Sequence, residues 1–328
     1  DDLEVVIGGY SSPTSSNPIF VINADGSDVD GFPLVLGEKV KGGIALADFN
    51  GNGKDDMVIG TDSDNIHLIY DDGNSAPGFP FAAGDKCQSS PAIIDINGEK
   101  IILVGCNDDN FYALNSDGSQ RFNIPTGNKI LTSPSFLKHE GLVYVFFGST
   151  DGMVYAVDIN GNALSGWPVS TNGNIVGSVV FSDLNEDGIP EIVAATDMGD
   201  LLALNLDGNG NYVHYFPIIN ELPFSSSPMI TDLDGDNDLE ILTGSGANLF
   251  VVDVKEVGSN TDYFNMYRGN NQRTGYFQME TDDSCGASLG DVNGDGNINI
   301  LDLVQISNLI LDFGSPAYEC AADFTQDG

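Results

Sequence analysis

The feature that most constrains this chain is a unit of strand, acidic turn and strand that recurs along it. Its clearest copy reads Met229-Ile-Thr-Asp-Leu-Asp-Gly-Asp-Asn-Asp-Leu-Glu-Ile-Leu-Thr-Gly244. Two apolar runs of strand length flank a turn in which Asp232, Asp234, Asp236 and Glu240 hold positions 1, 3, 5 and 9. Alternate residues of a tight loop direct their oxygens toward one point, and Ca²⁺ takes about six to eight oxygen ligands. Crowded carboxylates repel one another unless a cation lies among them, which favours a calcium loop over a hairpin turn without an ion.

Further copies of this unit occur elsewhere in the chain. Two copies keep oxygen-bearing side chains at the same four positions, and the predicted ligands are Asp48, Asn50, Asn52 and Asp56 in one and Asp183, Asn185, Asp187 and Glu191 in the other. The copy at 94–105 has a shortened turn, and the copy at 136–148 keeps its strands but loses the acids. Calcium is therefore predicted for three of these turns.

An aromatic residue, usually followed by proline, recurs in step with the acidic unit. The positions are Phe32, Phe79, Phe122, Trp167 and Phe216, and the spacings are 47, 43, 45 and 49 residues. A fixed period in this range, with several short strands in each period, indicates a β-propeller or a related repeat array. We expect the aromatic residue to pack between neighbouring repeats, and a platform for stacking carbohydrate is the alternative.

Each full repeat contains four strand candidates, which in one repeat are 43–47, 56–60, 65–70 and 79–82. Residues 1–8 match 238–244, so we expect the chain to begin inside a repeat, with upstream residues or another segment supplying the first strand. The fold class is therefore all-β, a propeller of about six four-stranded blades, with seven or eight as alternatives. Residues 276–279 are expected to pair as a closing strand, and Arg268 and Arg273 to pair with nearby acids, a ligand being the alternative.

Composition excludes several classes of partner. The 328 residues carry a net charge of −38, which argues against nucleic acid and against anionic membrane surfaces, because both require basic patches. Disorder is excluded because 41% of the residues are hydrophobic and fall in strand-length runs. No apolar run reaches the length of a membrane span.

The four cysteines suggest two disulfides. Cys87 begins one predicted strand and Cys106 ends the next, which places them side by side in an antiparallel pair. Cys285 and Cys320 bracket the last segment and form the second candidate pair, and four free buried thiols are the alternative. Disulfides together with calcium loops favour an extracellular setting.

The composition changes after the repeats. We assign residues 1–280 to the propeller, 281–290 to a polar linker and 291–328 to a calcium-binding module. The module opens with an EF-hand loop whose oxygen-bearing residues at positions 1, 3, 5, 7, 9 and 12 are Asp291, Asn293, Asp295, Asn297, Asn299 and Asp302. A helix is predicted over 300–313, and 322–328 opens a second loop of the same type.

These motifs resemble two known families. The acidic loops of residues 1–280 are similar to those of FG-GAP/VCBS-type repeats of extracellular β-propellers. Residues 285–328 resemble the first half of a type I dockerin, a small α module of paired calcium-loop-helix units that binds a cohesin domain. In that family, positions 10 and 11 of the loop help to select the partner, and here they are Ile300 and Leu301.

The sequence therefore predicts a non-catalytic calcium-binding protein, secreted or displayed on a bacterial cell surface. The propeller would serve adhesion or scaffolding, and the tail would attach it to a cohesin-like protein, with an extracellular glycan as another candidate ligand. An enzyme is the main alternative, because polysaccharide lyases and quinone-dependent dehydrogenases use related propellers. However, His67, His139 and His214 share no motif, and basic residues to hold an acidic sugar are scarce. Self-assembly as a filament or matrix subunit is the third hypothesis.

Overall fold

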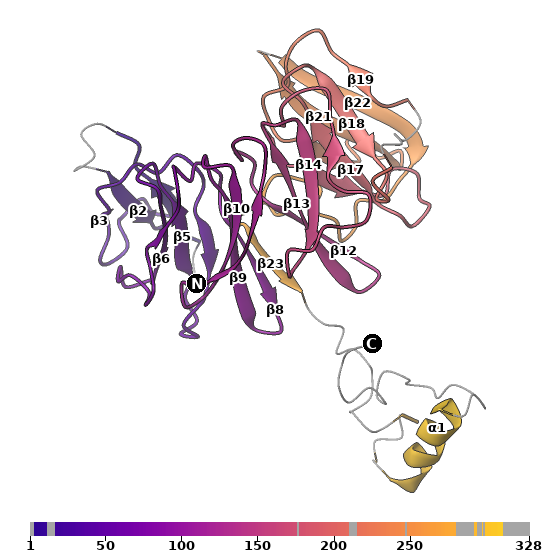
Figure 1. Cartoon of the computed structure of the whole chain (residues 1–328), viewed down its shortest axis with the longest axis horizontal. Coiled ribbons are helices and arrows are strands. Elements are labelled where there is room, and N and C mark those ends of the chain that lie inside the picture. The colour runs from indigo at the N-terminus through magenta and orange to yellow at the C-terminus, as the bar shows by residue number, and fades with distance from the viewer. Residues whose placement is uncertain are drawn as a thin grey trace. The chain divides into compact units, whose positions relative to one another are not determined.

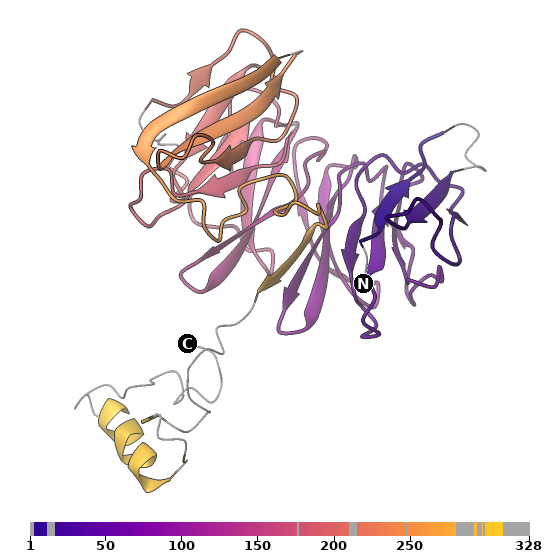
Figure 2. The same cartoon turned by 180° about the vertical axis from the view of Figure 1, so that it is seen from behind.

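The computed structural model describes residues 3–11, 17–175, 177–209, 215–246, 248–279, 292–293, 297 and 299–310. The chain divides into two compact units, residues 1–278 and 279–328. In the described part of the first unit, the strands form six sheets that follow one another in chain order (Figures 1 and 2). We call these sheets blades 1 to 6.

The first three blades contain β1 to β11. Blade 1 consists of β1 (Val5–Gly8), β2 (Pro18–Ile22) and β3 (Leu34–Val35). Blade 2 consists of β4 (Ala45–Ala47), β5 (Asp56–Gly60), β6 (Asn65–Ile69) and β7 (Phe81–Ala82). Blade 3 consists of β8 (Ala92–Ile96), β9 (Glu99–Gly105), β10 (Asn110–Asn115) and β11 (Gln120–Pro125).

The last three blades contain β12 to β22. Blade 4 consists of β12 (Ser135–His139), β13 (Leu142–Ser149), β14 (Met153–Asp158) and β15 (Val169–Ser170). Blade 5 consists of β16 (Val180–Ser182), β17 (Glu191–Ala195), β18 (Asp200–Leu204) and β19 (Ile218–Ile219). Blade 6 consists of β20 (Met229–Thr231), β21 (Asp238–Ser245) and β22 (Asn248–Val257).

The strands of each blade pair antiparallel in sequence order, as expected for a repeated meander. Second strands in the middle of the series are buried along their whole length, as in β5 and β17. Their runs of apolar residues follow from this position, because a sheet covered on both faces has no side that must be polar. In β1, by contrast, exposed and half-buried residues alternate.

Apolar packing between neighbouring blades forms the core. One cluster joins blades 1 and 2, a second joins blades 2 and 3, and a third joins blades 5 and 6. Stacked rings of Phe111 and Phe147 connect blades 3 and 4, with centroids 4.0 Å apart. An edge-to-face contact between Phe146 and Phe181 at 5.0 Å connects blades 4 and 5. The core is therefore divided into layers, each shared by two blades.

The recurring aromatic residue lies in these layers, which confirms its predicted packing role. Phe32, Phe79 and Phe216 belong to the three apolar clusters. Trp167 of blade 4 packs edge-to-face on Phe146, and its indole N–H donates to the carbonyl of Leu206, which follows β18 in blade 5. A buried indole thus finds its hydrogen-bond partner in the next blade.

Serine hydroxyl groups add polar links between blades just before the innermost strands. The Ser90 hydroxyl accepts from the Gly43 N–H at 2.7 Å, and the Ser178 hydroxyl accepts from the Ser133 N–H at 3.0 Å. The Ser227 hydroxyl accepts from the N–H of Ser178 at 2.8 Å. Each link satisfies a backbone donor at a place where neighbouring blades come close.

Residues 259–279, which we call the closing segment, bind the inner strands of four blades. The Ser259 carbonyl accepts from Asp183 in blade 5, and the Asn265 carbonyl accepts from Ile230 in blade 6. Further on, the Thr274 carbonyl accepts from Leu46 in blade 2. The segment ends in β23 (Tyr276–Met279), which pairs with β8 of blade 3 (Figure 1). The predicted closing strand therefore exists, but it extends blade 3 and does not join the first blade to the last.

Arg268 holds the closing segment from inside. The side chain is 2% exposed, and one guanidinium nitrogen donates to the carbonyls of Ile44 at 2.7 Å and Thr274 at 2.9 Å. The Cβ that an alanine would place at Gly43 or at Gly275 would lie 2.3 Å from this guanidinium. Arg268 thus bonds backbone carbonyls, where the sequence had suggested carboxylates, and glycine leaves the space for it.

A disulfide joins Cys87, in the connection from blade 2, to Cys106, which directly follows β9. Both residues are fully buried, and their Cα atoms are 4.1 Å apart. This predicted pair is confirmed, and it ties blade 3 to the connection that leads into it. The other predicted pair, Cys285 and Cys320, lies outside the described residues.

We expect the substitution Arg268→Ala to lower the free energy of unfolding by about 2–4 kcal/mol, because it removes buried charge-assisted hydrogen bonds and leaves a void. The matched control is Arg273→Ala in the same segment, where the exposed side chain donates to the Tyr267 carbonyl. The control should cost about 1 kcal/mol or less. Urea denaturation measures both, and equal losses would contradict the role of Arg268.

Candidate metal centres

Three acidic loops occupy the same place in their blades. Each connects the first strand to the second: β4 to β5 in blade 2, β16 to β17 in blade 5, and β20 to β21 in blade 6. The antiparallel pairs at their bases are Ala47–Asp56, Ser182–Glu191 and Thr231–Glu240. In each loop, the acid at position 9 is therefore already part of the second strand.

The acid at position 1 organises each loop by accepting backbone N–H groups. Asp48 accepts from Gly51 and Gly53, both at 2.7 Å. Asp183 accepts from Asp187 at 3.1 Å and Gly188 at 2.8 Å, and Asp232 accepts from Gly235 at 2.7 Å and Asn237 at 3.3 Å. These are Asx-type turns, in which a short acidic side chain replaces part of the backbone ladder.

The acid at position 9 closes each loop from the other side. It accepts the N–H of the residue at position 2: Asp56 from Phe49 at 2.8 Å, Glu191 from Leu184 at 2.7 Å, and Glu240 from Leu233 at 2.6 Å. All three acids are buried. The three loops thus fold alike, as their shared spacing predicts.

Position 6 of the loop requires a left-handed backbone. Its φ is 83° at Gly53 and 84° at Gly188. In blade 6 this position is Asn237, with φ 74°. Asparagine is one of the few other residues that adopt this conformation at low cost, which explains how the blade 6 loop keeps its shape without the glycine.

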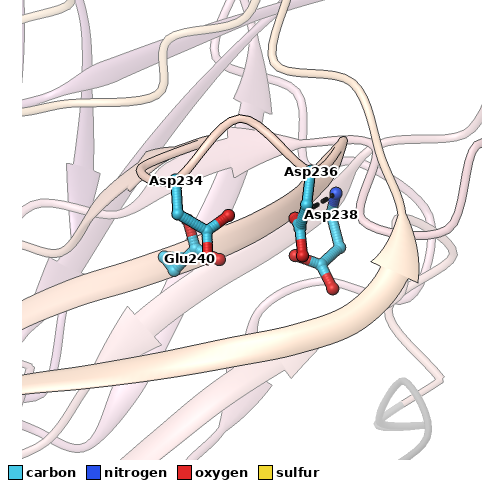
Figure 3. Close-up of side chains that lie close together, drawn as sticks. All are labelled: Asp234, Asp236, Asp238 and Glu240. Atoms are coloured by element: carbon cyan, nitrogen blue, oxygen red, sulfur yellow. Dashed lines mark hydrogen bonds between the residues drawn. The ribbon is translucent and has the colours of Figure 1, made fainter.

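The blade 6 loop brings four carboxylates together. Asp234, Asp236, Asp238 and Glu240 each offer an oxygen within 4.8 Å of the others (Figure 3). Asp234 and Asp236 are exposed, whereas Asp238 is half-buried and Glu240 is 4% exposed. Asp232 is not in this group, and its carboxylate accepts the turn N–H groups instead. The site is therefore built from an exposed rim and a buried floor.

Two oxygen atoms in this cluster suit a bound cation. Oδ1 of Asp238 and Oε1 of Glu240 are buried and have no hydrogen-bond partner in the described part of the chain. Hydrogen bonding to Asp236, burial and the charge of Asp236 raise the pKa of Asp238 to about 6. A hard divalent cation would satisfy both unpaired oxygens and offset the repulsion, so the all-oxygen donor set fits Ca²⁺.

The loops of blades 2 and 5 contain fewer acids. Burial raises the pKa of Glu191 to about 7, with further repulsion from Asp187 and Asp183, so a cation would also relieve this carboxylate. Burial likewise raises the pKa of Asp56. Asn50 and Asn185 donate from their amides to the position 9 acids at 3.3 and 3.4 Å. Asn52 also uses its amide as a donor, to Asp71 at 2.8 Å.

Blade 3 shows how the same turn manages without a cation. Its shortened loop keeps one buried acid, Asp95, which pairs with Lys100 at 2.9 Å and accepts from the Tyr276 hydroxyl at 2.9 Å. A lysine and a phenol here neutralise the charge that blade 6 places among other acids. This agrees with the prediction that blade 3 lacks a calcium loop.

The second unit contains the EF-hand-like loop. Its helix α1 (Ile300–Ile310) begins directly after Asn299, whose side chain accepts from Leu301 N–H at 2.9 Å. In return, Asp302 accepts the Asn299 N–H at 2.8 Å, which makes a reciprocal cap. Asp302 is 1% exposed and also accepts from Asn293 N–H at 3.3 Å, so position 12 reaches back across the loop. Asn297 uses its backbone carbonyl to accept from Asn299. The predicted ligands Asp291 and Asp295 lie outside the described residues.

Asp238 is the residue of the blade 6 cluster that sequence reasoning missed. It holds position 7, which was assigned no side-chain role because an EF-hand uses a backbone carbonyl there. The corresponding residues in the other loops are Lys54 and Ile189. The available signal was the unbroken alternation of acids from Asp232 to Asp238, which only this loop has.

Comparison with known proteins agrees with these two kinds of loop. Residues 183–243 match the FG-GAP-like repeat family, and residues 289–328 match the dockerin type I domain. The chain carries an FG-GAP-like repeat and a type I dockerin domain. No curated protein matches the chain at a significant level.

Solved structures agree on the fold. Two crystal structures of BBS1N in complex with ARL6DN, one soaked with mercury and one with lead, resemble the chain with a TM-score of 0.50 each. Each shares 14% identity and covers 77% of this chain and 74% of that chain. At this identity the likeness concerns the fold alone, which is β-propeller-like. The predicted class is confirmed: a β-propeller of six blades in the described residues, with a small α module after it. The blade series does not close into a ring.

We expect Asp234→Ala to lower the melting temperature by roughly a few degrees in Ca²⁺ and to have little effect in EDTA, because a bound ion stabilises only the folded state. The control is Asp30→Ala, which removes an exposed acid far from the acidic loops in sequence. Thermal melts of the three proteins in both buffers provide the measurement. An equal loss in Ca²⁺ and EDTA would remove the metal assignment for this loop.

Proposed function

We propose that this chain is a non-catalytic, calcium-stabilised binding or scaffolding protein that is attached to a protein partner through its dockerin domain. The observation that supports this most is the dockerin match at residues 289–328, together with the oxygen-lined loop that caps α1. Dockerin type I domains bind calcium and bind cohesins. The proposed partner is therefore a cohesin-like domain.

The described start of α1 is suited to a protein contact. Ile300, Leu301, Leu303 and Val304 are 68%, 57%, 61% and 51% exposed. Exposed apolar residues grouped in this way on one short helix favour an interface with another protein over contact with water. Ile300 and Leu301 are also the residues that the family resemblance associates with partner choice.

The propeller supports a binding role through its exposed loops and faces. Two hollows in the described part have volumes of about 250 and 260 Å³, at or below the size of typical ligand pockets of roughly 300–1,000 Å³. One of them includes His67, whose imidazole lies 3.2 Å from the Glu38 carboxylate, which also accepts from Thr61 and Asn65. The role of Glu38 in this network is to satisfy the polar groups at the end of blade 2.

A secreted or cell-surface location fits these features. Dockerin and FG-GAP domains are typical of extracellular proteins, and the buried Cys87–Cys106 disulfide suits an oxidising compartment. Among the described residues, no helix has the length and apolar character needed to cross a membrane. A net charge of −38 further favours partners that are basic or that bind through calcium.

Binding to a panel of cohesin domains, measured by calorimetry, tests the proposal. The full chain should bind at least one member in Ca²⁺ and none in EDTA, because the loop must hold its ion to position α1. Asp302→Ala should weaken binding at least about tenfold, since it removes the buried carboxylate at position 12, and Asp30→Ala should not. Binding that survives EDTA unchanged would contradict a calcium-dependent dockerin.

The non-catalytic assignment has its own test. Incubation of the protein with a panel of uronic-acid polymers should release no unsaturated product that absorbs in the near ultraviolet. Few basic residues are available to hold such a polymer, since lysine and arginine together number 11. Release of that product would establish the lyase alternative.

A further inference from the structure

The first blade exposes a surface that the blades behind it bury. In blade 2, Met57 and Ile59 of β5 face blade 1 and are 2% and 0% exposed. The corresponding residues of β1 are Val5 and Ile7, which are 55% and 50% exposed. Blade 1 thus presents the same apolar half-interface with no described blade against it.

Strand register confirms this correspondence. In blade 2, Met57 and Ile59 lie opposite Ile69 and His67 of β6. In blade 1, Val5 and Ile7 lie opposite the half-buried Ile22 and Phe20 of β2. Residues opposite each other in an antiparallel pair share a face, so Val5, Ile7, Phe20 and Ile22 form one surface, which we call the leading face.

The last blade is open on the opposite side. In blade 2, Val58 and Leu68 lie on the face that packs on blade 3, and Ile66 lies beside them; all three are at most 1% exposed. The corresponding residues of blade 6 are Leu242, Val251 and Leu249. Val251 is 44% exposed and Leu249 is 69% exposed.

Register again places these residues on one surface. Leu242 lies opposite Met229 of β20 on one side and opposite Val251 of β22 on the other. Ala45, Val58 and Leu68 make the same row in blade 2. We call the surface formed by Met229, Leu242, Leu249 and Val251 the trailing face.

The two open blades also lack different strands. In the described residues, blade 1 has no strand inside β1, whereas blades 2 to 6 each pair their second strand with an inner one. Blade 6 has no strand beyond β22, whereas blades 2 to 5 each have an outer one. The unpaired edge of β1 therefore lies beside the leading face and adds backbone groups that can pair.

We propose that the leading face of one copy of this chain binds the trailing face of another. The two faces are the two halves of an interface that the chain already forms between its own blades, so they match in shape and apolar character. Such a contact is head-to-tail, and it extends to a further copy unless the series closes as a ring.

The closing segment favours a second copy over contact within one chain. Its backbone bonds to blades 5 and 6 at one end and to blades 2 and 3 at the other hold the series as it is. In that arrangement, no described strand of blade 6 pairs with blade 1. Bringing the two faces together within one molecule would require some of these bonds to break.

Sedimentation velocity over a concentration series in Ca²⁺ tests the proposal with Ile7→Glu and Leu249→Glu. Both positions are exposed, so both variants should fold, and each should weaken self-association at least about tenfold by placing a carboxylate in an apolar contact. The control Ile219→Glu, at a residue of β19 that is 67% exposed, should associate like the unmodified chain.

Mixing the two variants gives the sharpest result. Ile7→Glu keeps an intact trailing face and Leu249→Glu keeps an intact leading face, so the mixture should form one-to-one pairs and nothing larger. A face-to-face dimer would not produce this pattern. An unmodified chain that stays monomeric at every concentration, or a mixture that forms no pairs, would overturn the proposal.

Discussion

Apolar contact between neighbouring blades is the interaction on which the rest of this structure depends. Each blade is a thin sheet that cannot bury both of its faces alone, so blades 2 to 5 are stable because they lie between others. The aromatic residues that recur along the chain serve this contact, as Trp167 shows by packing on its own blade and bonding the next. The closing segment adds a second link, made of backbone hydrogen bonds and the buried Arg268.

The acidic loops follow from the same architecture. Inter-blade packing fixes the ends of the first and second strands, and this holds each loop in a tight turn with its position 9 acid buried. A buried carboxylate is costly unless it is paired, and the blades meet that cost in different ways. Blade 3 places Lys100 against Asp95, whereas blade 6 gathers four carboxylates around two unpaired oxygens. The acidity of the chain is thus concentrated where a cation can balance it.

The dockerin domain brings a different use of the same ion chemistry. In the propeller, the loops connect strands and stabilise a blade, while in the tail the loop leads into α1 and positions its exposed apolar residues. Asp302 shows this coupling, because one carboxylate both caps the helix and reaches back to Asn293. Calcium is therefore proposed to stabilise the propeller and to control attachment, two roles that separate measurements can distinguish.

The sequence alone determined the all-β repeat class, the strands of blade 2, the Cys87–Cys106 pair and the shape of the acidic loops, because these depend on local periodicity and spacing. It did not determine that Asp238 joins the blade 6 cluster, since that depends on how the loop folds over the buried Glu240. Nor did it show that Arg268 binds carbonyls or that β23 extends blade 3. Those contacts join residues far apart in the chain, as Arg268 and Ile44 are, and only the packing of the blades brings them together.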